Sequence, residues 1–196
     1  GPFAVGVHAS PSNAKPNILL ILADDLSWFD LGCYGSEDVR TPNIDQLARE
    51  GMTFTHAYTA TAMCSPTRQQ LYTGLFPARS GAMANHSSVK QGTRSMAHHL
   101  SELGYEVSLS GKEHFGPPES FPFERKEGLS IPSGPEPFCL VHASKKPHDG
   151  WPDARGYDPS ALTVPPYLVD NLETRRSLSR YFTEITELDE EVKTLL

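Results

Sequence analysis

One short aliphatic run constrains the fold of this chain more than any other feature. Residues 17–23 read Asn-Ile-Leu-Leu-Ile-Leu-Ala and end abruptly at two adjacent acids, Asp24 and Asp25. Continuous rather than alternating apolar character is typical of a strand that is buried on both faces, as in a parallel sheet. The run is too short to span a membrane. We therefore predict a buried parallel strand that ends at a pair of carboxylates.

The rest of the chain alternates between strand and helix character. Residues 41–51 carry a threonine cap, a proline at the first helical position and a terminal glycine, which together predict a helix. Further predicted strands cover residues 52–58, 105–110 and 138–141, and further predicted helices cover residues 93–103 and 178–196. This order predicts an α/β fold with a mostly parallel central sheet and helices on both faces. Residues 75–92 and 115–137 are expected to be loops.

Composition limits the possible functions. With 17 Lys and Arg against 24 Asp and Glu, the net charge is −7, so no overall basic field attracts nucleic acid. An anionic substrate would therefore need a local cationic pocket. The chain has three cysteines, so at least one cannot pair with another, and their spacing fits no zinc pattern. Residues 85–87 match the N-glycosylation pattern, which matters only in a eukaryotic secretory host.

Cys64 stands at the start of a predicted helix. Ser65 is a suitable N-cap, Pro66 suits the first helical position, and Gly74 is a suitable stop. Free backbone N–H groups and the helix dipole would favour an anion near Cys64, and Arg68 adds a cation one turn further on. This setting predicts a reactive thiol. The alternative is a buried cysteine beside an ordinary capped helix.

Other polar side chains also follow predicted strands, where ligand sites of open α/β sheets lie. Asp24 and Asp25 would repel each other unless a cation joins them, so a hard divalent ion such as Ca²⁺ or Mg²⁺ is one interpretation. Lys112 and His114 follow the strand at 105–110, and His148 follows the strand at 138–141. In each case the alternative is an ordinary solvated turn.

These motifs resemble the type I, formylglycine-dependent sulfatases of the alkaline-phosphatase-like superfamily. Residues 64–68, Cys-Ser-Pro-Thr-Arg, followed by Leu-Tyr-Thr-Gly at 71–74, match that family's Cys-x-Pro-x-Arg signature. The other matching segments, in order and approximate spacing, are 15–25, 41–45 and 111–114. The resemblance implies that residues 17–196 are the N-terminal portion of a sulfatase catalytic domain, with residues 1–16 a tail or the remnant of a tag or export signal.

The resemblance further implies a metal centre and a modified nucleophile. Cys64 would be oxidised to formylglycine by a separate maturation enzyme. Its hydrate would bind Ca²⁺, or less favourably Mg²⁺, through one hydroxyl that also attacks the sulfur of a sulfate ester. Asp24 and Asp25 would be the other metal ligands. The second hydroxyl could then expel sulfate, which avoids hydrolysis of an enzyme-bound ester as stable as the substrate.

The remaining site residues are also assigned by resemblance. Arg68 and Lys112 would hold the diol and spread its developing negative charge. His114 would take the remaining hydroxyl proton, and His148 would protonate the leaving alcohol. The implied protein is a sulfuric ester hydrolase acting on a sulfated carbohydrate, without a membrane span. It would be exported to the periplasm, the cell exterior or, in a eukaryote, the lysosome.

Two alternatives remain open. The first is a hydrolase of phosphonate or phosphate monoesters, because such enzymes of the same superfamily share this nucleophile and metal site. The second is a non-catalytic fragment that needs a further chain. Family members are considerably longer and take additional metal ligands and a lysine from their later half. Asp170 and Asn171 are such a pair by residue type, but they follow a proline-rich loop rather than an apolar strand, so we do not count them.

Overall fold

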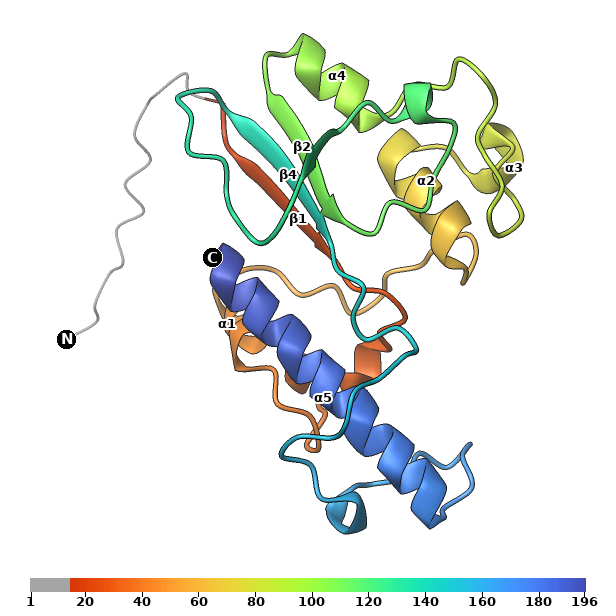
Figure 1. Ribbon diagram of the computed structural model, residues 1–196, viewed down its shortest axis with the longest axis vertical. Helices are drawn as coiled ribbons and strands as arrows, with labels where there is room; N and C mark the ends of the chain where they lie inside the picture. The colour runs from red at the N-terminus through yellow and green to blue at the C-terminus, as the bar shows by residue number, and fades with distance from the viewer. Residues whose placement is uncertain (1–14) are drawn as a thin grey trace, which may run out of the picture.

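A four-stranded parallel sheet forms the centre of the molecule, in the order β1-β4-β2-β3 (Figure 1). The computed structural model describes residues 15–196, so the predicted tail at 1–16 falls outside the described residues except for its last two positions. The strands are β1 (Ile18–Leu22), β2 (Glu106–Gly111), β3 (Glu124–Lys126) and β4 (Phe138–Ala143). The predicted parallel α/β sheet is confirmed. The predicted burial of the first strand on both faces is wrong, because β1 lies at the edge of the sheet and its residues are half-buried.

Strand β4 organises the sheet because it pairs with two neighbours. Cys139 lies opposite Ile18 of β1 and opposite Val107 of β2, and every residue of β4 is buried. At the other end of the strand, Ala143 lies opposite both Leu22 and Gly111. Because all three strands run parallel, the polar residues that follow them reach the same edge of the sheet.

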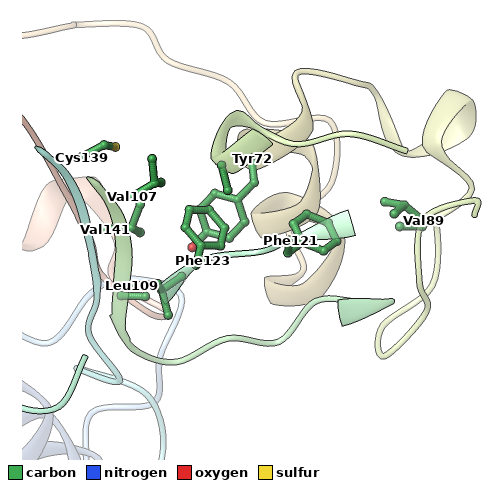
Figure 2. Close-up of a cluster of buried hydrophobic side chains, with 11 residues drawn as sticks. Tyr72, Val89, Val107, Leu109, Phe121, Phe123, Cys139 and Val141 are labelled. Atoms are coloured by element: carbon green, nitrogen blue, oxygen red, sulfur yellow. The ribbon is translucent and has the colours of Figure 1, made fainter. Parts of the chain in front are cut away.

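Helices cover both faces of the sheet. The helices are α1 (Pro42–Glu50), α2 (Cys64–Thr73), α3 (Pro77–Ser80), α4 (Met96–Glu102) and α5 (Leu172–Leu195), with short 3₁₀ turns at Trp28–Asp30, Gly32–Tyr34, Pro118–Ser120 and Pro159–Ala161. Cys139 and Val141 share one buried cluster with Tyr72 of α2 and Ala97 of α4 (Figure 2). Phe138 and Leu140 point the other way and pack with Leu195 of α5. This alternation follows the two-residue period of a strand.

Two of the strand assignments need correction. The predicted strand at 52–58 is wrong: the segment has no regular structure, all its residues are exposed, and Met52 and Phe54 are 78% and 65% exposed. Its alternating apolar pattern pairs with none of the strands in the described part of the chain. Conversely, β3 lies within the predicted loop at 115–137, and its sequence Glu-Arg-Lys has no apolar pattern. Pairing with Ser108–Ser110 makes it a strand.

The N-terminal caps of two helices also differ from prediction. Helix α2 begins at Cys64 with Met63 in the cap position, so Ser65 lies inside the first turn. There the Ser65 hydroxyl accepts a hydrogen bond from Nε2 of Gln69 at 3.0 Å. Gly74 ends α2 in the left-handed conformation, φ 68°, as predicted. The expected loop at 75–92 contains the short helix α3.

Helix α1 starts at Pro42 as predicted, but Thr41 does not cap it. The cap comes instead from α5, where the Asp189 carboxylate accepts hydrogen bonds from the backbone N–H groups of Asn43 (3.1 Å) and Ile44 (2.8 Å). The Thr41 hydroxyl accepts from Gly32 N at 3.0 Å. No helix within residues 15–196 is long and apolar enough to cross a membrane.

Candidate active site

A buried ion cluster lies at the carboxyl ends of β1 and β2. Asp24 directly follows the end of β1 and is 3% exposed. Its Oδ1 accepts a hydrogen bond from Nη2 of Arg68 at 3.1 Å, and its Oδ2 forms an ion pair with Nζ of Lys112. Nη1 of Arg68 also donates to the Lys112 carbonyl oxygen at 3.2 Å. Three residues from distant segments therefore form one cluster.

The electrostatics of this cluster favour a bound anion. Burial by itself would raise the pKa of Asp24, but the hydrogen bonds and charges of Lys112 and Arg68 outweigh burial and hold that pKa below its usual range. Two cations thus surround one carboxylate, which leaves a net positive charge in a poorly hydrated place. The chain as a whole is negative, so the positive charge of this cluster is local.

Gly111 allows Lys112 to reach Asp24. Strand β2 ends at Gly111 with φ +89°, and a Cβ atom there would lie 2.1 Å from the carbonyl oxygen of Ala143. The same carbonyl accepts a hydrogen bond from Lys112 N at 2.7 Å. The left-handed backbone and the close approach both require glycine, so the sequence Gly-Lys after a buried strand is what places this lysine.

Cys64 opens onto a cavity of about 330 Å³ beside the ion cluster. The cavity is lined by Asp24, Asp25, Cys64 and Arg68 together with apolar side chains. Asp25 has a left-handed backbone, φ 64°, and its side chain is exposed, with Oδ2 3.7 Å from Nε2 of His148. The loop that carries His148 is tied to the site because the Lys146 carbonyl accepts a hydrogen bond from Asp24 N at 2.9 Å.

His114 contacts a histidine that was not predicted as a site residue. Its Nε2 lies 2.8 Å from Nδ1 of His86, and Oδ1 of the neighbouring Asn85 lies 3.6 Å from the Cys64 sulfur. Burial, and then the positive charge of Lys112, lower the pKa of His114. Its Nδ1 is buried without a hydrogen-bond partner. In the sequence, Asn85 and His86 stand out only as part of an N-glycosylation motif. Their approach to Cys64 and His114 depends on the path of a loop, which no local pattern predicts.

The fit to a metal ion is partial. Asp24 and Asp25 supply carboxylate oxygens, the donors that Ca²⁺ prefers, but Ca²⁺ takes about 6–8 oxygen ligands. Among residues 15–196, no group of three or more His, Cys, Asp or Glu side chains converges to hold an ion. Asp170 and Asn171 serve α5 instead: Oδ1 of Asn171 caps its first turn by accepting from Thr174 N at 2.9 Å. The described residues therefore fit part of a calcium site.

The comparison with known proteins agrees with this architecture. The sulfatase family model matches residues 16–131, more than half of the chain. The chain is 34% identical to the ulvan-active sulfatase of Formosa agariphila over 210 aligned residues, which cover 96% of this chain and 42% of that protein. It is 39% identical to the N-acetylgalactosamine-6-sulfatase of Canis lupus familiaris over 126 residues, 58% of this chain and 24% of that enzyme.

Solved structures share the fold. A putative sulfatase, yidJ, from Bacteroides fragilis superposes with a TM-score of 0.74 at 23% identity, covering 97% of this chain and 59% of that one. Ps i-CgsB superposes with a TM-score of 0.71 at 25% identity, covering 92% of this chain and 54% of that one. The fold is thus the N-terminal part of an alkaline-phosphatase-like α/β domain. The chain belongs to the sulfatase family, and it spans less than half the length of the ulvan-active sulfatase that it matches.

Proposed function

We propose that the protein is a sulfuric ester hydrolase that removes sulfate from a sulfated carbohydrate. The observation that carries the proposal is the placement of Cys64, at the first residue of α2, on the same cavity as Arg68 and two carboxylates. A carbohydrate substrate is favoured because the relative named an ulvan-active sulfatase aligns with 96% of this chain. The steryl-sulfatase of Mus musculus, by comparison, aligns with only 55% of this chain.

The cations of the site have a defined part in this chemistry. The Arg68 guanidinium presents a planar fork of N–H groups that suits the oxygens of a sulfate group. Lys112 adds a second positive charge about the same carboxylate. Fixed cations in a water-poor site stabilise negative charge more strongly in the transition state than water does. We propose that these two residues bind the sulfate group and spread the charge that develops on it.

The nucleophile and the proton carriers complete the proposal. Converted to formylglycine and hydrated, residue 64 would supply one hydroxyl for attack on sulfur and a second for release of sulfate. Asp24 and Asp25 would be part of the ligand set for Ca²⁺, which would supply further positive charge. The lowered pKa of His114, caused first by burial, keeps its imidazole neutral and able to accept a proton. The exposed His148, beside Asp25, is the residue to which we assign protonation of the leaving alcohol.

The test begins with the modification at residue 64. The protein is produced together with a formylglycine-generating enzyme, and the peptide that contains residue 64 is examined by mass spectrometry. We expect the mass loss of a thiol-to-aldehyde conversion, together with sulfate release from a sulfated sugar and from 4-nitrophenyl sulfate. Cys64→Ala should lower both activities by at least about 10³-fold, as the loss of a nucleophile does. An unmodified cysteine from a competent host, with no sulfate release, would contradict the proposal.

The same preparation separates the two alternatives. Faster turnover of an aryl phosphonate ester than of the aryl sulfate would favour a phosphonate monoester hydrolase. The intact mass and the calcium content of the purified protein test the fragment hypothesis: a chain of this length without bound Ca²⁺ and without activity would support a non-catalytic module. An exported location, periplasmic, extracellular or lysosomal, stays a prediction.

A further inference from the structure

A second cavity of about 530 Å³ adjoins the first one, and Asp25 lines both. Its volume falls within the range of about 300–1,000 Å³ that is usual for small-molecule sites. The aromatic side chains of Trp151, Tyr167 and Tyr181 contribute to its wall. They come from the loop after His148, from the loop before α5 and from α5 itself, whereas Cys64 lines only the first cavity.

Hydrogen bonds hold the aromatic wall in place. Nε1 of Trp151 donates to the Pro147 carbonyl oxygen at 2.8 Å, and the rings of Trp151 and Tyr181 meet edge to face with centroids 5.6 Å apart. The Tyr181 hydroxyl donates to Oδ2 of Asp30 at 3.0 Å and accepts from Ser27 N at 3.3 Å. A wall fixed in this way loses little conformational entropy when a ligand binds.

The charge of this cavity is opposite to that of the ion cluster. Asp25, Asp30 and Glu173 line it, and among the described lining residues there is no lysine or arginine. The hydroxyls of Ser27, Thr174 and Ser177 add further hydrogen-bonding groups. Flat aromatic rings pack against the C–H faces of a sugar, and carboxylates accept hydrogen bonds from its hydroxyls. A second sulfate or a carboxylate on the ligand would be repelled here.

We propose that the second cavity binds an uncharged sugar ring of the substrate while the sulfate ester enters the first cavity. This inference rests on the proposed sulfatase function. His148 supports the arrangement because it lies beside Asp25, the residue that both cavities share. The bond between the sugar oxygen and sulfur would then lie near the residue proposed to protonate that oxygen. The substrate class that follows is a sulfated neutral sugar, without a second acidic group on the ring in this cavity.

Tryptophan fluorescence offers a direct binding test that does not need catalysis. The chain has two tryptophans, and Trp28 is 65% exposed and does not line the cavity, so Trp28→Ala leaves Trp151 as the sole reporter. This variant is titrated with monosulfated and with disulfated galactose, glucose and N-acetylglucosamine. We expect a saturable change with at least one monosulfated sugar and at least tenfold weaker binding of its disulfated form. Glu173→Lys, a change of an exposed residue, should reduce that discrimination at least threefold.

Kinetics distinguish a failure of this inference from a failure of the proposed function. In the formylglycine-containing protein, Trp151→Ala should raise KM for a monosulfated sugar at least tenfold, with Trp151→Phe intermediate. Trp28→Ala, outside the cavity, should leave that KM within about twofold. Normal hydrolysis of 4-nitrophenyl sulfate, with no Trp151 response to any sugar, would overturn the sugar site alone. No sulfate release from any ester would overturn the proposed function, and the fluorescence titration would still decide whether the cavity binds sugars. Equal binding of monosulfated and disulfated sugars would overturn the charge argument.

Discussion

Gly111 illustrates at the residue scale how the site depends on backbone shape. The ion cluster needs Lys112 beside Asp24, a carboxylate that follows a different strand. Gly111 is the last residue of β2, so the change of chain direction before Lys112 occurs at this residue. That residue has φ +89°, and it lies against the carbonyl of Ala143, which Lys112 N also uses. A residue without a side chain is therefore as necessary to the cluster as the charged residues are.

We predict that Gly111→Ala destabilises the protein and displaces Lys112. The positive φ alone costs about 1–3 kcal/mol for alanine, and the overlap of its Cβ with the Ala143 carbonyl adds to that cost. Chemical denaturation should show this loss in the free energy of unfolding. Gly134→Ala is the matched control, because Gly134 has open space around it and no positive φ. It should change the same free energy by less than about 0.5 kcal/mol. Equal effects of the two substitutions would refute the role given to Gly111.

At the scale of secondary-structure elements, α5 does more than pack. The helical spacing of its apolar residues indicates only a packing role. The structure shows that Asp189, 1% exposed, reaches the first turn of α1, where it also accepts from Nδ2 of Asn43 at 2.6 Å. A buried carboxylate at a helix N-terminus satisfies free N–H groups and interacts favourably with the helix dipole. Helix α1 is thus capped from another element.

Asp189→Asn should lower the free energy of unfolding by about 1–3 kcal/mol, because the amide retains one acceptor where the carboxylate offers two. Chemical denaturation measures the change, and circular dichroism at 222 nm before the transition would report fraying of α1. Asp153→Asn is the control: its side chain is fully exposed and lies 3.7 Å from Arg180. The assignment of Asp189 as the cap would be wrong if both variants were as stable as the unmodified protein.

At the scale of the whole molecule, a polar network joins the sheet to α5. Oε2 of Glu191 lies 3.2 Å from Nε2 of the buried His142 of β4, and Oε1 lies 3.6 Å from Nζ of Lys146. His142 in turn lies 2.8 Å from the hydroxyl of Ser110 in β2. The loop that carries Lys146 continues to His148. This network therefore links the long helix, two strands and the loop beside the candidate site.

The network predicts how stability changes with pH. Burial alone would raise the pKa of Glu191, but hydrogen bonds with His142 and Ser144 and the charge of Lys146 outweigh it and lower that pKa. A lowered pKa means that ionised Glu191 stabilises the folded state at pH values above the ordinary glutamate range. That stabilisation is lost as the pH falls through the lowered folded value. Unfolding experiments should therefore find Glu191→Gln less stable than the unmodified protein near pH 6, with the difference shrinking below about pH 4.

The exposed neighbour provides the control for this pH experiment. Among residues 15–196, Glu190 forms an ion pair only with Lys193, with Oε2 3.3 Å from Nζ on the surface of α5. Exposed pairs contribute about 0–1 kcal/mol. Glu190→Gln should therefore change the free energy of unfolding little at any pH between 3 and 7. The opposite result is that Glu191→Gln differs from the unmodified protein by the same free energy of unfolding at every pH from 3 to 7. That result would contradict the stabilising role given to ionised Glu191.

The sequence by itself determined the elements whose local pattern matches their final environment. The aliphatic run before Asp24 predicts a parallel strand and the amphipathic stripe predicts α5, because strands and helices leave different periodicities. The run does not predict the burial of β1, which lies at the edge of the sheet and is half-buried. The polar residues that follow β1, β2 and β4 were predictable as a group for a topological reason: parallel strands bring their carboxyl ends to one edge.

Only the tertiary structure decided the remaining features, because each depends on partners distant in the chain. The residues of β3 form a strand through pairing with β2, whereas the alternating residues 52–58 find no partner and stay exposed. The contact of His86 with His114, the cap that Asp189 gives to α1 and the aromatic cavity beside Asp25 join segments that no local pattern connects. Short-range periodicity records how a residue is buried, but not which residue buries it.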